Sequence, residues 1–341
     1  MTIIELLLSL AAILGAAVLF TNAVEMLGER LNMGHGSVGS ILAAVGTALP
    51  ETMIPIVAIL GAVIVGTGGH AAGEIGVGAI LGAPFLLATL AFFLVGVSAI
   101  GFRRRRRTGS EIITTPQTLT DLVFFLICYG LATGAGVVRL PFFLKIILAV
   151  LLLLAYLLYV VWTIRHGGEA GEGEGEAPSN LTLWPLRSPA PTWAVATQLV
   201  GMVVVMGFAA HFFVDAVGHI SIAVGIPAGL IALVLAPLAT ELPEKFNSII
   251  WLRENKDTLA LGNITGAMVF QSTIPVSVGM IFTPWDLGFL GAFSAVLALL
   301  SGLVFIGFLV RKAPLRGFVM LGAGSLYVVF LVAATIVVTG L

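Results

Sequence analysis

Ten long apolar stretches, separated by short polar connections, constrain this chain more than any other feature. Each has about the 20 mostly apolar residues that a helix needs to cross a bilayer. They cover residues 4–24, 38–66, 74–100, 117–138, 142–164, 193–214, 224–252, 257–281, 287–310 and 316–339. Because backbone groups in lipid must be paired within the chain, the pattern predicts an all-α integral membrane protein with ten transmembrane helices.

Composition narrows the class of protein further. Only 10% of the 341 residues are charged and 59% are hydrophobic, whereas a soluble chain carries about 25% charged residues. This excludes a soluble enzyme. The formal net charge of −1 leaves no basic surface that would bind nucleic acid. The single cysteine, Cys128, excludes a disulfide framework and a cysteine-based metal site.

Basic residues gather in the odd-numbered connections between the apolar stretches. The third connection holds five arginines at 103–107, the seventh holds Arg253 and Lys256, and the ninth holds a cluster at 311–316. By the positive-inside rule these connections are cytoplasmic, so both termini are expected outside the cell membrane. The fifth connection, 165–191, is rich in glycine and glutamate and is expected to be a flexible cytoplasmic loop.

The two halves of the chain, 1–164 and 192–341, repeat each other. Residues 47–51 read TALPE and residues 240–244 read TELPE. Each half holds five of the predicted helices, and because five is odd, the second half must enter the membrane from the opposite side. This arrangement is the inverted-topology repeat of many secondary transporters, which work by alternating access.

The repeated motif places carboxylates at membrane depth. Glu51 and Glu244 end its two copies, and Glu241 lies inside the second copy. Charge in the bilayer core is costly, so intramembrane carboxylates indicate a functional site. The structural alternative is that each is protonated or paired, and Lys245 is the available partner on the second copy.

Other oxygen ligands lie within one or two helical turns of these glutamates. The proline before each glutamate removes a backbone donor and is expected to open the helix, which frees carbonyl groups. The predicted cation ligands are Glu51, Glu244, Thr47, Thr240, Glu241, Gln271, Ala44 and Pro237, the last two through carbonyl oxygens. An all-oxygen set suits calcium, which takes about six to eight oxygen ligands. Zinc and soft metals are disfavoured because no cysteine or histidine cluster is present.

Pairs of glycines mark the segments that follow each motif. Gly78 and Gly82 lie in the third segment, and Gly262 and Gly266 lie in the eighth. Small residues allow helices to approach closely, which is expected to bring the next helical turn into the site. In the eighth segment that turn carries Gln271, whereas the third segment has only apolar residues there.

These motifs resemble those of the calcium/cation antiporters, the family that includes the sodium/calcium exchangers. The family motif Gly-Thr-Ser-Leu-Pro-Glu is similar to residues 46–51 and 239–244. The second family motif, Gly-Asn-x-x-Gly-Ser-Asn-x-x-Asn/Asp, is similar to residues 78–87 and 262–271. The resemblance implies a sodium/calcium exchanger-like fold of two inverted five-helix repeats.

The resemblance also implies roles for particular residues. Glu51 and Glu244 would be the central calcium ligands, flanked by Thr47 and Thr240. The second, third, seventh and eighth segments would form a core, and the first and sixth would slide past it to switch access. No tightly bound cofactor is expected, since the ions are substrates.

Several residues depart from the family pattern at positions that bind sodium or supply auxiliary polar groups. The departures are Ala48 and Glu241 at the serine of the first motif, Ala83 and Ala267 at the serine of the second, and Leu87 and Gln271 at its end. The first repeat has therefore lost polar ligands while the second has gained a carboxylate. Divalent binding is the firmer expectation, and sodium coupling the weaker one.

The leading hypothesis is a secondary active cation antiporter that exchanges calcium, or a similar divalent cation, for sodium. One alternative is a proton-coupled exchanger, because clustered carboxylates in a low dielectric can carry protons. Another is a non-transporting cation sensor or scaffold that keeps the fold. No enzyme activity is expected; His211 and Asp215, one turn apart, are expected to form a structural hydrogen bond.

Overall fold

The computed structural model describes residues 2–30, 51–61, 69–166, 181–184 and 190–340, and it is almost entirely helical. Eight helical spans are long and apolar enough to cross a membrane. The helices are α1 (Thr2–Arg30), α3 (Gly69–Leu86), η2 (Leu87–Ala91), α4 (Phe92–Gly101), α5 (Pro116–Val137), α6 (Phe142–His166), α7 (Thr192–Val224), α8 (Ala228–Arg253), α9 (Asp257–Gln271), α10 (Ile274–Phe282), α11 (Gly288–Val310) and α12 (Gly317–Thr339).

The eight spans coincide with eight of the ten predicted segments. The other two are shorter apolar helices, Glu51–Leu60 and the Ala228–Glu241 part of α8. These are the two segments that carry the repeated motif, and residues 38–50 of the first lie outside the described residues. The ten-helix layout is therefore consistent with the structure.

The sixth predicted segment, 193–214, is too short, because α7 continues to Val224. Asp215 does not end the helix, since its carboxylate lies 3.4 Å from His211 Nε2, one turn earlier on the same helix. The expected contact between these two residues is thus present. The helix ends at Gly225, whose positive φ of 69° closes it in the left-handed conformation that favours glycine.

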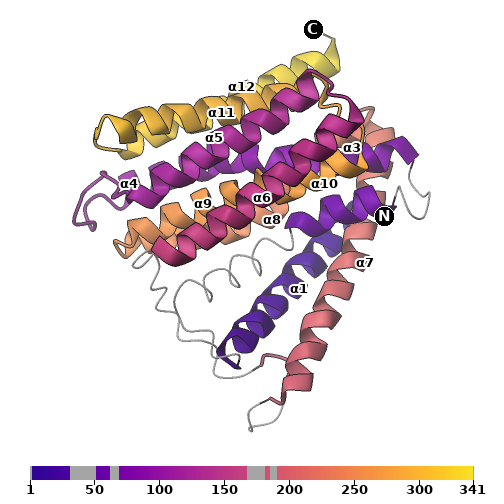
Figure 1. Ribbon diagram of the computed structural model, residues 1–341, viewed down its shortest axis with the longest axis horizontal. Helices are drawn as coiled ribbons and strands as arrows, with labels where there is room; N and C mark the ends of the chain where they lie inside the picture. The colour runs from indigo at the N-terminus through magenta and orange to yellow at the C-terminus, as the bar shows by residue number, and fades with distance from the viewer. Residues whose placement is uncertain (1, 31–50, 62–68, 167–180, 185–189, 341) are drawn as a thin grey trace.

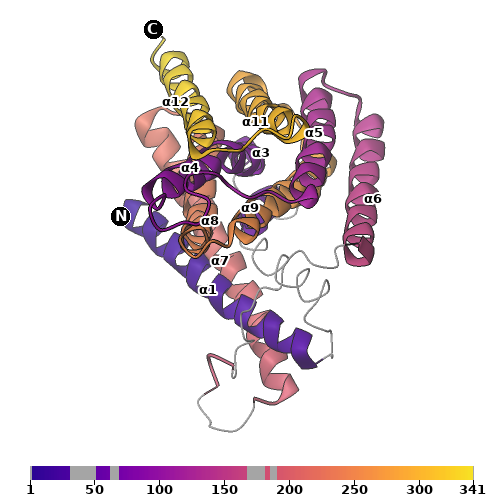
Figure 2. The same ribbon diagram turned by 90° about the vertical axis from the view of Figure 1, so that its left-hand side faces the viewer.

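Two helices lie apart from the others. In Figures 1 and 2, α1 and α7 run side by side and extend away from the main bundle. Within the bundle the Ala71–Gly101 span is central, since 78% of its most apolar stretch is buried inside the protein. The corresponding share for α6 and for α12 is 17%, so most of their apolar surface is left to face lipid.

Several helix pairs have an equivalent pair formed by their counterparts in the other half of the chain. Helix α4 packs on α12, and its counterpart α10 packs on α6. In the same way α5 packs on α9 and α11 packs on α3. The pairs α1·α7 and α5·α11 each join a helix to its own counterpart. This symmetry is what an inverted repeat requires.

Contacts between connections show which of them lie at the same end of the bundle. At one end the third connection meets the seventh, where Arg106 Nη2 lies 2.5 Å from Asp257 Oδ2. It also meets the ninth, since the Ile112 amide donates to the Leu315 carbonyl at 2.8 Å. At the other end the fourth and eighth connections meet, because Lys145 of α6 donates to the Pro284 carbonyl at 2.7 Å. The third, seventh and ninth connections thus lie together at one end and the fourth and eighth at the other, in line with the grouping of the loop charges. Which end is cytoplasmic stays a prediction.

Glycines set how closely α3 approaches α8. A Cβ atom on Gly78 would overlap the carbonyl oxygen of Gly229, and one on Gly82 would overlap that of Leu233. The expected close approach of the third segment to the motif-bearing seventh is therefore confirmed. For Gly262 and Gly266, no described atom lies within 4 Å of such a Cβ.

Candidate functional site

One amide group joins the carboxylates of the two repeats. Gln271, the last residue of α9, donates from Nε2 to Glu51 Oε2 at 2.6 Å and to Glu241 Oε1 at 3.4 Å. All three side chains are buried, with at most 8% of each residue exposed. A hydrogen bond to an ionised group is stronger than one between neutral groups. The structure thus brings together three of the predicted ligands from three separate helices.

The backbone at Gln271 explains how its side chain reaches the site. Helix α9 stops there because the hydroxyl groups of Ser272 and Thr273 both donate to the Val269 carbonyl, at 2.8 and 3.1 Å. Pro275 then opens α10, where a missing N–H costs nothing. The break leaves Gln271 as the last residue of α9, and from this position its amide reaches Glu51.

A lysine balances one of the buried carboxylates. Lys245 lies one turn beyond Glu241 on α8, with Nζ 3.4 Å from Glu241 Oε2. The same ammonium donates to Asn263 Oδ1 of α9 at 3.0 Å. Lys245 is 1% exposed and Glu241 is fully buried, and isolated charges at such depth would be very costly. The pairing that the sequence offered as the structural alternative for Glu241 is confirmed.

Two other predicted ligands on α8 are described. Thr240 is buried, and its hydroxyl donates to the Ala236 carbonyl at 3.0 Å, which leaves the oxygen able to accept. Pro237 is buried where α8 meets α3, close to Gly82. Helix α8 runs through Pro237 and Pro243 without interruption. The predicted opening of the helix at Pro243 is therefore wrong, because the backbone of α8 stays helical there although the proline lacks an N–H.

The remaining predicted ligands lie outside the described part of the chain. Residues 31–50 include Ala44 and Thr47, and the side chain of Glu244 is likewise outside it, although its backbone belongs to α8. Among the described side chains, no group of three or more His, Cys, Asp or Glu gathers to hold a metal ion. The assignment of Glu244, Thr47 and Ala44 as ligands stays a prediction.

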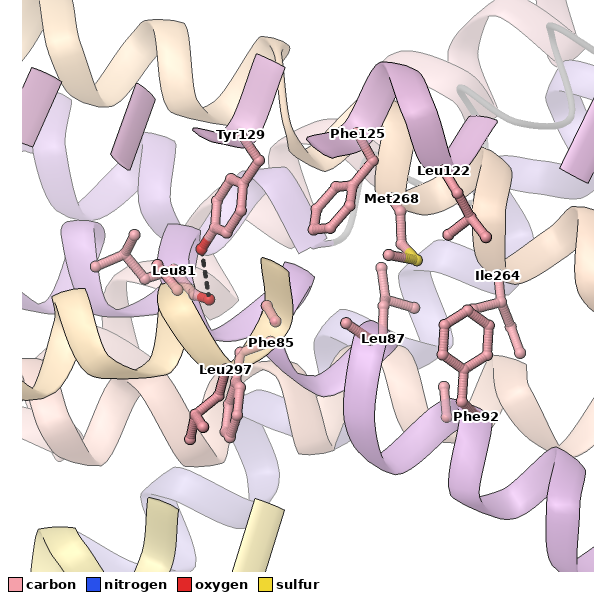
Figure 3. Close-up of a cluster of buried hydrophobic side chains, with 14 of the residues drawn as sticks. Leu81, Phe85, Leu87, Phe92, Leu122, Phe125, Tyr129, Ile264, Met268 and Leu297 are labelled. Atoms are coloured by element: carbon pink, nitrogen blue, oxygen red, sulfur yellow. Dashed lines mark hydrogen bonds between the residues drawn. The ribbon is translucent and has the colours of Figure 1, made fainter. Parts of the chain in front are cut away.

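The first repeat has no polar counterpart to Gln271. Leu87 and Ala88 are fully buried in the main apolar core. Figure 3 shows Leu87 facing Met268 and Ile264 of α9, with Phe92 nearby. Leu87 therefore makes an apolar packing contact at the position where the family has a polar residue. The face of α9 toward Leu87 is apolar, whereas the end of α9 carries the amide that bonds to Glu51.

Sequence reasoning missed the links between these groups rather than the groups themselves. Gln271, Lys245 and Asn263 all stand out as polar residues in apolar segments. Their mutual contacts depend on how α8 and α9 pack, and no spacing along the chain encodes that. An amide shared by carboxylates of both repeats could not be predicted without the three-dimensional structure.

The amino-acid sequence of this chain is similar to those of known membrane proteins. The family model described as "Sodium/calcium exchanger protein" matches residues 1–165 and 194–337. An uncharacterized membrane protein of Methanocaldococcus jannaschii is 24% identical over 263 residues, which cover 77% of this chain and 76% of that protein. A putative antiporter, CaxA, of Alkalimonas amylolytica is 30% identical over 154 residues, or 42% of this chain and 48% of the relative. Vacuolar cation/proton exchanger 3 of Arabidopsis thaliana is 27% identical over 135 residues, which cover 40% of this chain and 29% of the relative.

Solved structures share the fold at low sequence identity. The H⁺/Ca²⁺ exchanger CAX superposes with a TM-score of 0.76 at 17% identity, covering 99% of this chain and 85% of that one. The sodium-calcium exchanger NCX_Mj superposes with a TM-score of 0.57 at 19% identity, covering 97% of this chain and 99% of that one. The fold is therefore that of the cation exchangers.

Proposed function

This chain belongs to the sodium/calcium exchanger protein family, whose members are cation antiporters, and on that premise we propose that it exchanges calcium, or a similar divalent cation, for protons. The observation that carries the proposal is the hydrogen bond from Gln271 to Glu51, 2.6 Å long. It directs the polar end of α9 to the repeated glutamate. Amide and carboxylate oxygens are the ligands that calcium prefers.

The charges of the site match a divalent cation. Glu51, Glu241 and Glu244 contribute three carboxylates, and Lys245 contributes one ammonium. Three carboxylates and one ammonium leave a formal net charge of −2 at the site. A calcium ion would neutralise this charge, and so would two protons. An empty, doubly negative site would resist crossing the apolar barrier, which favours exchange over leak.

Protons suit this site better than sodium as the counter-ion. A sodium ion would need several neutral oxygens besides the carboxylates, yet Leu87 and Ala88 of the first repeat are buried in apolar packing. Glu241, at the family's sodium-binding position, already has Lys245 as a cation beside it. A carboxyl group needs only a proton to become neutral, with no further ligands. The similarity to a vacuolar cation/proton exchanger supports the same assignment.

Sodium is the second candidate, and the repeated motif favours it. The motif keeps its threonine in both copies, and Thr240 is buried with an oxygen that can still accept. The sequence alone ranks sodium first, because the family resemblance includes sodium/calcium exchangers. The counter-ion therefore has to be identified by transport measurements.

Alternating access would involve the separate pair α1·α7. These helices pack mainly on each other and extend away from the main bundle (Figures 1 and 2). In the proposed cycle they slide past α3, α8 and α9, while Glu51, Glu244 and the end of α9 stay in place. Rigid-body movement of this kind around a fixed site is how many inverted-repeat transporters work.

The direct test is uptake of radioactive calcium into proteoliposomes under imposed gradients. We expect an outward proton gradient to drive uptake without sodium, and an outward sodium gradient at clamped pH to drive none. Uptake driven by sodium alone would establish the second candidate. Calcium binding without flux under either gradient would contradict antiport by this chain.

Site variants test the ligands separately from the counter-ion. Glu51→Gln and Glu244→Gln are each expected to abolish exchange, because each removes one of the two repeated carboxylates. Glu254→Gln is the matched control, since Glu254 lies exposed at the end of α8, beside Lys256 at 3.2 Å. Normal exchange by both site variants would contradict the assignment of the site.

A further inference from the structure

A second buried carboxyl group lies outside the central site. Asp121 of α5 is 2% exposed. Its Oδ2 accepts from the Thr265 hydroxyl of α9 at 2.6 Å. Its Oδ1 accepts from the Tyr159 hydroxyl of α6 and from Gln117 Nε2, both at 2.7 Å. Three helices thus converge on one carboxyl group.

The partners of Asp121 are all neutral. The contrast is Asp257, which is equally buried but bonded to the Arg106 guanidinium and to the Ile113 amide. Among the described residues, no lysine, arginine or histidine contacts Asp121. A buried aspartate that served only to hold helices together would ordinarily need a positive partner.

The described charged and titratable groups on the surrounding helices are engaged elsewhere, neutral or exposed, and Arg165 near the end of α6 is the exposed one. On α9, Asp257 is held by Arg106. On α6, Lys145 donates to the Pro284 carbonyl, while Tyr156 packs its ring on Phe270. On α5 itself, Tyr129 donates to the Leu81 carbonyl at 3.3 Å (Figure 3), and Cys128 is the other titratable group. Helix α11 carries none.

The shell around Asp121 can satisfy either protonation state. Two of its three partners are hydroxyl groups, which donate to a carboxylate or rotate to accept from a carboxylic acid. Thr265 is fully buried, whereas Tyr159 and Gln117 are half-buried and bonded to each other at 2.9 Å. The shell therefore has one closed side, against α9, and one side from which a proton could arrive.

Asp121 holds the face of α9 that points away from the central site. Thr265 follows Asn263 by two residues, which places the two about 200° apart around the helix. Asn263 accepts from Lys245, and the end of the same helix donates to Glu51. Any change in the bond from Thr265 to Asp121 therefore acts on the helix that serves the central carboxylates.

We propose that Asp121, with Tyr159, Thr265 and Gln117, is a proton-binding site separate from the central cation site and coupled to it through α9. The Asp121 carboxylate accepts a proton from a hydronium ion, which becomes water, and the Thr265 hydroxyl rotates so that its oxygen accepts from the new O–H. Release transfers the proton back to a water molecule and restores the hydronium ion. The first turns of α5 lie at the end of the bundle predicted to be cytoplasmic. The coupling rests on the proposed exchange function, but proton binding does not.

Infrared difference spectroscopy of the purified protein tests proton binding without transport. Between high and low pH we expect several carboxylic acid bands, one of which is missing in Asp121→Asn and present in Glu51→Gln and Glu254→Gln. An Asp121→Asn spectrum that keeps every carboxylic acid band of the unmodified protein would overturn the proposal. Asp121→Asn is nearly isosteric, and an unfolding temperature close to that of the unmodified protein would show that the variant folds. If it does not fold, Thr265→Val, which should shift the band, takes its place.

Transport tests the coupling. Thr265→Val is expected to move the pH midpoint of calcium uptake by about one unit, since it removes one hydrogen bond to the ionised group, and Thr265→Ser is expected to restore it. A fall in activity with an unchanged pH midpoint would indicate a merely structural role. Binding of radioactive sodium that Asp121→Asn abolishes would assign the site to sodium and overturn the proton assignment. If no exchange is found but the infrared band behaves as expected, the central function fails and the proton site stands.

Discussion

The span formed by α3, η2 and α4 and its counterpart formed by α9 and α10 share a backbone irregularity but not its chemistry. In the first half the helix widens into a π-helix at Leu87, shortly after Pro84. In the second half α9 ends at Gln271, the position aligned with Leu87. Helix irregularities of this kind are common at functional sites. Here the first is filled with apolar packing, and the second supplies an amide to carboxylates of both repeats.

The motif-bearing helices differ in the same direction. The second half carries Glu241 and Lys245 as a buried ion pair, and the first half has Ala48 and Thr52 at the corresponding positions. At these positions the first half therefore has the same backbone arrangement with mainly apolar residues, and the second half carries the charged and amide groups. A symmetric fold does not require symmetric ligands, because residues at the centre can serve both halves.

The largest effect should come from unbalancing the ion pair that only the second half has. Lys245→Met leaves Glu241 buried without its cation, which should cost about 3–5 kcal/mol of folding free energy. The double variant Glu241→Ala with Lys245→Thr, which copies the first half, should recover most of that loss. Thermal unfolding in detergent measures both. If the double variant is as unstable as the single one, the pair is not what fixes this part of α8.

The close packing of α3 on α8 should be almost as sensitive. Gly82→Ala forces a methyl group into the Leu233 carbonyl, and overpacking of this kind costs about 1–3 kcal/mol or more. Gly73→Ala on the same helix meets no described atom within 4 Å and should be neutral or stabilising, by up to about 1 kcal/mol. Equal unfolding temperatures for the two variants would show that the close approach is not needed.

Removing the amide from the second half should weaken ion binding more than folding. Gln271→Leu gives the second half the residue of the first and removes the amide oxygen that would bind the ion, an interaction with a charged group worth about 1.5–3 kcal/mol. Calcium affinity should fall about 10- to 100-fold. Gln271→Glu keeps an oxygen ligand and is the matched variant. Unchanged calcium affinity in Gln271→Leu, measured by competition in the uptake assay, would remove the amide from the site.

Adding the amide to the first half should not create a ligand. Leu87→Gln places a polar group among Met268, Ile264 and Phe92, which should cost about 1–3 kcal/mol of folding free energy without raising calcium affinity. Leu87→Met nearly conserves volume and should cost less than about 1.5 kcal/mol. A gain in calcium affinity in Leu87→Gln would mean that position 87 faces the ion after all.

Much of this architecture follows from the sequence, and the exceptions have physical causes. Apolar length and loop charge predicted the spans and the grouping of connections at two ends, because both reflect transfer into lipid. The repeated glutamates were found because charge is scarce in the membrane. The predicted end of the sixth segment failed at Asp215, where an intrahelical partner allows the helix to continue. The predicted opening at Pro243 failed because α8 stays helical through this residue.

Contacts between distant segments were beyond sequence reasoning. The bond between Gln271 and Glu51 joins residues 220 apart in the chain. Likewise, Asp121 drew no attention as one carboxylate near a helix start, until α6 and α9 supplied its hydroxyl partners. Such networks depend on side-chain directions within the packed bundle.

The most direct test of the account is to measure calcium and proton fluxes together in sodium-free proteoliposomes with the membrane potential clamped. We predict that about two protons leave for each calcium ion that enters, since either would neutralise the net charge of two negatives at the site in the bilayer core. Glu51→Gln should show neither flux, and Glu254→Gln should show both. Calcium uptake that requires sodium and moves no protons would contradict this prediction.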